Sequence, residues 1–111
     1  MICGASNIDI NFIRRFMNQI SKCFIIIGGH KGVEQTVRVN AMTHSIRYKV
    51  NMKYDHIRDM SMRLYSIYTE EKPCKVYILD NDYENNQYKY KFTEYLPIEI
   101  DIIVVNSHHC G

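Results

Sequence analysis

Apolar residues recur at helical spacing near the start of the chain, which predicts a helix over about residues 10–20. Polar side chains fill the positions between them, as on the solvent face of a surface helix. Either Asn7 or Asp9 is suited to cap its first turn, because a short polar side chain accepts a hydrogen bond from a free helix N–H group. The apolar positions are Ile13, Phe16, Met17 and Ile20.

A second helix is predicted between Asp55 and Pro73. Asp55 is a suitable N-cap, and Pro73 ends the helix because proline has no N–H group to donate. Asp59 and Arg63 are four residues apart, the spacing of an ion pair on a helix surface. The predicted apolar face contains Ile57, Met60, Leu64, Ile67 and Tyr68.

Strands are predicted from short apolar runs and from alternation of apolar and polar residues. Residues 23–27 are a nearly continuous apolar run, and residues 46–52 alternate with a basic outer face. Shorter alternation covers residues 36–41. The remaining strands are predicted over residues 75–79, 87–93 and 98–105, with hairpin turns at 42–45 and 80–86.

These elements give the order α-β-β-β-α-β-β-β within a single domain over residues 1–111. Short turns between successive strands favour antiparallel pairing. The predicted fold is therefore α+β, with two helices packed on a mainly antiparallel sheet. Residues 106–111 are expected to be a frayed C-terminal tail.

Composition is that of an ordinary globular domain, with 46% hydrophobic and 23% charged residues. The net charge of +2 is compatible with contact to nucleic acid but is not by itself evidence for it. No apolar run reaches the roughly 20 residues that span a bilayer, so no membrane partner is expected. The four cysteines are far apart and no secretory signal is seen, which favours a cytoplasmic or other reducing intracellular compartment.

A glycine-rich turn follows the first predicted strand and is the leading candidate site. Glycines let the backbone approach a ligand closely, and Lys31 supplies a cation for an anion held by N–H groups. The alternative is a plain turn with an exposed basic tip, because neither the dinucleotide nor the P-loop motif is present. The turn consists of Gly28, Gly29, His30, Lys31 and Gly32.

Basic side chains on two predicted strands are the second candidate. If both strands belong to one sheet, their basic sides converge into a patch that follows a phosphate backbone. The alternative is that these lysines are ordinary solvent-facing residues that protect strand edges. The residues are Arg47 and Lys49 on one strand, and Lys89 and Lys91 on the other.

Metal binding and catalysis have weaker support. The acidic turn at residues 80–84 and the tail His108-His109-Cys110 carry metal-ligand types without the spacing of a known site. His30 and His44 could act as acid and base in a metal-free nuclease. Because no constellation is assembled, no catalytic residue, metal or cofactor is predicted.

The function that these patterns favour is a small non-catalytic binding module that contacts RNA, single-stranded DNA or a nucleotide. One alternative is a protein–protein interaction or self-associating subunit, because the last predicted strand is apolar on both sides. A small nuclease is the third. Ile, Asn, Lys and Tyr make up 42 of the 111 residues, which favours a low-GC genome such as a viral or organellar one.

Overall fold

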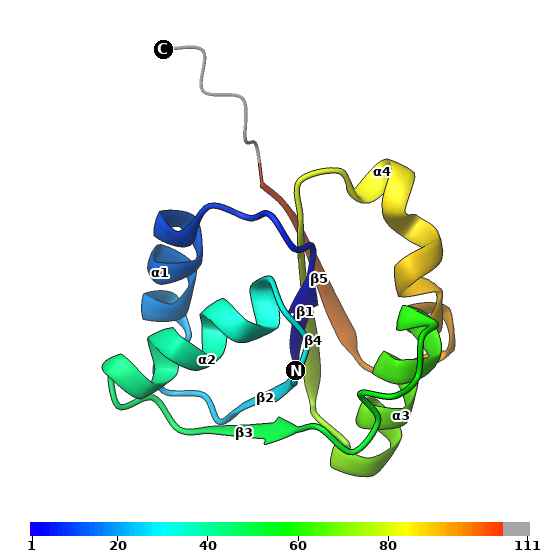
Figure 1. Cartoon of the computed structure of the whole chain (residues 1–111), viewed down its shortest axis with the longest axis horizontal. Coiled ribbons are helices and arrows are strands. Elements are labelled where there is room, and N and C mark those ends of the chain that lie inside the picture. Colours follow the sequence, from blue (N-terminus) through cyan, green and yellow to red (C-terminus); the bar gives the residue numbers. More distant parts are fainter. Residues whose placement is uncertain (106–111) are drawn as a thin grey trace.

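Strands and helices alternate along the chain in the computed structural model, which describes residues 1–105 (Figure 1). The last helical segment, η1, has the tighter 3-10 geometry and is kinked at Tyr90, where φ is −116°. The order is β1 (Ile2–Gly4), α1 (Ile10–Gln19), β2 (Ile25–Gly28), α2 (Val33–Thr43), β3 (Tyr48–Asn51), α3 (Met60–Glu71), β4 (Lys75–Asp80), α4 (Tyr83–Asn86), η1 (Gln87–Tyr95) and β5 (Glu99–Val104).

The strands form two small sheets, with the orders β1-β4-β5 and β2-β3. Every pair within them is parallel, with Ile2 opposite Tyr77, Lys75 opposite Glu99 and Ile25 opposite Tyr48. β1 also contacts β2, so the two sheets lie next to each other. The α+β class is confirmed, but the expected mainly antiparallel sheet is wrong.

Two segments that were predicted as strands are helical, and this explains the error in strand direction. Residues 36–41 belong to α2, where Val33, Val37 and Ala41 are buried at a spacing of four. Residues 87–93 lie in η1. The expected hairpin turns at 42–45 and 80–86 are wrong for the same reason, because helices connect the flanking strands and a parallel connection needs such a crossover.

Helix boundaries follow local capping chemistry. Asp9 caps α1 by accepting a hydrogen bond from Asn11 N at 3.0 Å, as expected. Asp59, and not Asp55, caps α3 by accepting from Met62 N at 3.0 Å. Since Asp59 is used in this way and Arg63 is buried elsewhere, the expected surface pair between them is wrong.

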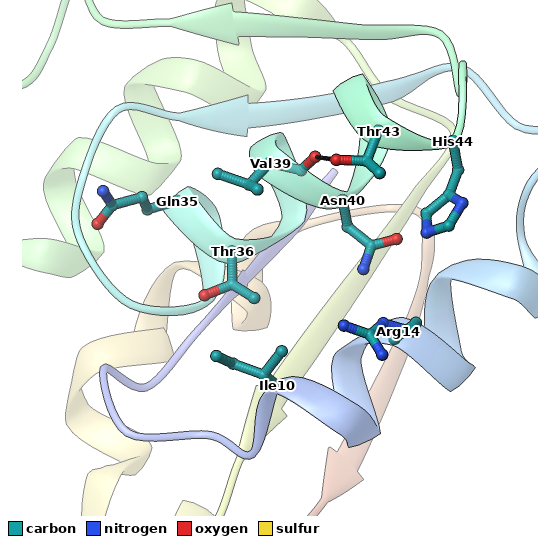
Figure 2. Close-up of a pocket in the computed structure, with 8 residues that line it drawn as sticks. All are labelled: Ile10, Arg14, Gln35, Thr36, Val39, Asn40, Thr43 and His44. Carbon is teal, nitrogen blue, oxygen red and sulfur yellow. Dashed lines mark hydrogen bonds between the residues drawn. The ribbon is translucent and has the colours of Figure 1, made fainter.

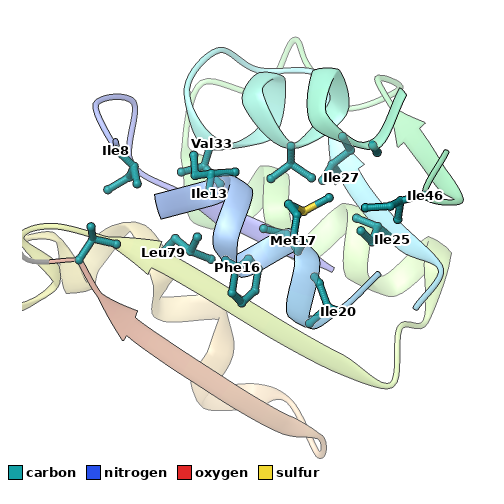
Figure 3. Close-up of a cluster of buried hydrophobic side chains, with 14 residues drawn as sticks. Ile8, Ile13, Phe16, Met17, Ile20, Ile25, Ile27, Val33, Ile46 and Leu79 are labelled. Carbon is teal, nitrogen blue, oxygen red and sulfur yellow. The ribbon is translucent and has the colours of Figure 1, made fainter. Parts of the chain in front are cut away.

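Two apolar clusters hold the helices on the strands. The first joins α1 and α2 to β1 and β2 through residues such as Ile13, Met17 and Ile27 (Figure 3). The second joins α3 and η1 to β1 and β4 through Leu64, Ile67 and Ile78. In Figure 1, α1 and α2 lie on one side of the β1-β4-β5 sheet, and α3 and η1 lie on the other. Each fully buried large side chain of this kind contributes about 1.5–3 kcal/mol.

No helix within residues 1–105 has the length and apolar character needed to cross a membrane. The predicted tail at residues 106–111 lies outside the described residues.

Candidate anion-binding site

A cleft of about 160 Å³ lies where β1 and β2 end and α2 and α3 begin. In open sheets of parallel strands, ligands characteristically bind outside the carboxyl ends of the strands. The cleft therefore occupies the edge of the molecule where this topology places ligands. It is lined by Gly4, Ala5, Ser6, His30, Lys31, Glu34, Arg58, Met60, Arg63 and Lys89.

The glycine-rich turn is shaped by close packing beside this cleft. Gly32 has φ +93°, and a Cβ there would lie 2.5 Å from Ser6 Cα. A Cβ on Gly28 would overlap the charged ends of Glu34 and Arg63. Gly32 thus lets the turn meet the chain after β1, and Gly28 leaves room for a charged pair beneath the turn.

The charged pair beneath the turn is buried. Arg63 Nη1 and Nη2 donate to Glu34 Oε1 and Oε2 at 2.9 and 2.8 Å, and the two residues are 1% and 2% exposed. A two-point contact of this kind fixes both side chains in one geometry. Arg63 Nε is buried as well, yet it has no hydrogen-bond partner within residues 1–105. A buried donor without an acceptor costs roughly 1–3 kcal/mol of stability.

Three further cations line the same cleft. Lys31 precedes α2, Arg58 precedes α3, and Lys89 lies in η1. In the described part of the chain, no carboxylate lies within 4.0 Å of any of them. The cleft therefore carries positive charge that the protein itself does not neutralise.

The beginning of α2 and the ring of His30 complete the site. No side chain within residues 1–105 caps α2, and the Val33 N–H donates to Ala5 O at 3.1 Å. The N-terminal end of a helix carries a partial positive charge. The His30 Nε2 lies 3.2 Å from Asp55 O and 4.0 Å from Asp55 Oδ1, which holds the ring against the loop before α3.

The structure brings only some of the predicted anion-binding residues together. His30, Lys31 and Lys89 line the cleft with the glycine turn beside them. Lys49 Nζ instead pairs with Glu71 Oε1 at 2.9 Å, at the end of α3. Arg47 lies next to the start of β3 and Lys91 is exposed in η1, and neither lines the cleft.

Arg58 and Arg63 were missed from the sequence. Arg63 lies between Met60 and Leu64, on the face that we predicted to be apolar. A charged residue within an apolar helix face signals a buried partner, since an isolated buried charge is too costly to keep. That signal was available, but its partner Glu34 lies in a segment predicted as loop or strand.

The acidic turn after β4 has a structural use. The Asp80 carboxylate, fully buried, accepts hydrogen bonds from the Tyr90 hydroxyl, from Asn86 Nδ2 at 3.2 Å and from Asp82 N at 2.7 Å. Burial, and then the bond to Asp80, raise the pKa of Tyr90. Within residues 1–105, no three His, Cys, Asp or Glu side chains gather as metal ligands. The tail His108-His109-Cys110 lies outside the described residues.

The two histidines proposed as a catalytic pair are far apart. His30 precedes α2 and His44 is its C-cap, so the whole helix separates them, a length of about 16 Å. They line different pockets. A nuclease that uses both residues on one substrate atom therefore has no shared site here.

Comparison with known proteins adds no assignment: no family model, curated protein or solved structure matches this chain.

Proposed function

We propose that this protein is a small, non-catalytic binding module that holds the phosphate group of a nucleotide in the cleft between β1, β2 and α3. The nucleotide is either free or part of RNA or single-stranded DNA. These partners share the phosphate that the cleft would bind, and the experiment below separates them.

The observation that carries this proposal is the convergence of three cations, none of which has a carboxylate of residues 1–105 within 4.0 Å. Lys31, Arg58 and Lys89 come from three separate segments and line one cleft of about 160 Å³. Like charges in one small cleft repel one another, and an anion bound between them relieves that repulsion. The volume is small, so it fits a phosphate group better than a whole base.

Two further groups favour an anion with several oxygen atoms. The N-terminal end of α2 presents N–H groups that no side chain caps. Arg63 also lines the cleft, and its buried Nε has no hydrogen-bond partner within residues 1–105. A phosphate has enough acceptor oxygens for these donors and for the lysines at the same time.

The test is fluorescence anisotropy with two probes, mant-ADP and a fluorescein-labelled single-stranded RNA, each in a salt series. We expect binding on the order of micromolar at low salt that weakens steeply as salt is added, because phosphate contacts release counterions. Lys31→Ala and Lys89→Ala should each weaken binding about tenfold, as expected for losing one charge-assisted hydrogen bond.

Lys91→Ala is the matched control, because Lys91 is also in η1 but does not line the cleft. It should bind like the unmodified protein. If mant-ADP binds as tightly as the RNA, the partner is a free nucleotide, whereas much tighter binding of the RNA indicates a single strand. Equal losses in Lys89→Ala and Lys91→Ala, or no binding of either probe at low salt, would contradict the proposal.

A second candidate function, self-association or protein–protein interaction, is favoured by one exposed surface. Met62, Tyr65 and Tyr95 are 63%, 45% and 72% exposed and line a groove of about 340 Å³ between α3 and η1. Exposed aromatic and methionine side chains are enriched at protein interfaces. A molecular mass that rises with concentration, measured by light scattering, and that returns to the monomer value in Tyr95→Ser, would support this function.

A further inference from the structure

A second cleft lies between α1 and α2, away from the carboxyl ends of the strands. It has a volume of about 320 Å³. Figure 2 shows Asn40 and His44 pointing from α2 toward α1, where Arg14 lies. The cleft therefore combines one permanent cation, one imidazole, two amide side chains and two threonine hydroxyls around a single space.

Asn40 is the unusual member of this group. It is only 7% exposed, and its Oδ1 is buried with no hydrogen-bond partner within residues 1–105. In Figure 2 its amide nitrogen points toward Arg14, so two groups that only donate hydrogen bonds face the same space. No carboxylate within residues 1–105 lies within 4.0 Å of Arg14. Arg14 and the amide nitrogen of Asn40 are therefore two donors available to an acceptor placed in the cleft.

Two of the residues that line the cleft are aliphatic. Ile10 on α1 and Val39 on α2 are 57% and 56% exposed, although both are large aliphatic side chains. Exposed aliphatic residues beside a buried amide and a guanidinium form an amphipathic site, with a polar end and an apolar end. This is the usual composition of a small-molecule site, in which a few polar groups orient an apolar ligand.

We propose that the cleft between α1 and α2 binds a carboxylate that carries an apolar group. The carboxylate accepts hydrogen bonds from Arg14 and from the amide nitrogen of Asn40, and the apolar group lies on Ile10 and Val39. A guanidinium matches the two oxygens of a carboxylate. A phosphate carries more negative charge than a carboxylate and fits less well here. This cleft has one permanent cation, Arg14, whereas the other cleft has three cations without a carboxylate partner among residues 1–105.

The same chemistry has two sources: a free small acid, or the C-terminal residue of a peptide. Both present a carboxylate next to an apolar side chain. The probes are therefore N-acetyl-leucine, N-acetyl-leucinamide, hexanoate and a short peptide that ends in leucine with a free carboxylate.

The experiment is a titration of the ¹⁵N-labelled protein followed by NMR. We expect N-acetyl-leucine to shift amides of α1 and α2 with a Kd on the order of 1 mM, as suits a ligand of this size. N-acetyl-leucinamide should bind at least about tenfold more weakly, because it lacks the charge. Tighter binding of the peptide than of N-acetyl-leucine indicates a protein C-terminus, and equal binding of hexanoate indicates a free acid.

Arg14→Gln should weaken N-acetyl-leucine about tenfold, while the neighbouring Arg15→Gln leaves it unchanged, since Arg15 is exposed and does not line the cleft. Asn40→Ala should also weaken binding, provided that its spectrum shows a folded protein. Lys31→Ala should have no effect, which separates this site from the proposed nucleotide site. Equal binding of acid and amide, equal loss in the two arginine variants, or shifts confined to the other cleft would each overturn the proposal.

Discussion

Two buried carboxylates lie on either side of β1, Glu34 after β2 and Asp80 at the end of β4, and their partners differ. Glu34 is held by a guanidinium, whereas Asp80 is held by three neutral donors from its own connection. In the first arrangement Arg63 lines a cationic cleft, and its buried Nε has no partner in the described part of the chain. The second closes the turn from β4 into α4. The end of β4 is thus closed by donors of its own connection, whereas the end of β2 faces the cleft.

The largest effect is expected from removing the Arg63 guanidinium, which pairs with Glu34. Arg63→Ala should destabilise the protein by about 3–5 kcal/mol, because it leaves the Glu34 carboxylate buried and unpaired. The free energy of unfolding in urea measures this effect.

The matched control is the double variant Glu34→Gln/Arg63→Met. With no buried charge left unpaired, it should recover most of the stability that Arg63→Ala loses. A cost for Arg63→Ala below about 1 kcal/mol, typical of a surface change, would show that the pair is not buried as described.

Removing the other carboxylate should cost less. Asp80→Ala leaves the Tyr90 hydroxyl and two further donors unsatisfied, so we expect a loss of roughly 2–3 kcal/mol in urea unfolding. Asp82→Ala is the control, because Asp82 is exposed and, among residues 1–105, its carboxylate accepts only from Asn85. It should change stability by less than about 0.5 kcal/mol. The Asp80 variant should still bind mant-ADP when folded, and a loss of binding there would place Asp80 in the site.

An exposed carboxylate at the end of α3 gives the smallest effect, and it is seen only in acid. Hydrogen bonds from Asn51, Tyr54 and Lys53 lower the pKa of Glu70 from its usual 4.5 to about 2. A carboxyl group with a lowered folded pKa contributes stability above pH 4.5, and that contribution is lost as the pH falls toward 2. Glu70→Gln removes the contribution at every pH. The difference in unfolding free energy between the two proteins should therefore be constant above pH 4.5 and shrink below it. Urea unfolding at a series of pH values measures this difference. A difference that does not change with pH would contradict the lowered pKa of Glu70.

The elements with a clear local pattern could be predicted from the sequence. The helix after Asp9 and the strands near residues 25, 48, 75 and 99 are where periodicity and capping placed them. Helix α2 was missed because Val37, Val39 and Ala41 also alternate with polar residues, as they would in a strand. The burial of Val33 and Val37 and the 56% exposure of Val39 show that the helical period holds instead. Because α2 was not predicted, the connection between β2 and β3 was predicted as a hairpin, and these strands were expected to be antiparallel rather than parallel.

The cleft was only partly predictable for a related reason. Lys31 and the glycine turn are local features, and the sequence pointed to them. Lys89 was selected as part of a strand face, and Arg58 was not selected at all. Tertiary packing of α3 and η1 beside the turn brings these residues to one place, and no local pattern carries that information.

The parallel pairing of β1 also has a consequence for the order in which the protein folds. Ile2 pairs with Tyr77, 75 residues later, whereas Ile25 pairs with Tyr48, only 23 residues later. On a ribosome, the β2-α2-β3 unit can close while β1 still waits for β4 to be synthesised. Closing the longer loop costs more chain entropy, so we expect the β1–β4 pairing to form after the β2–β3 pairing.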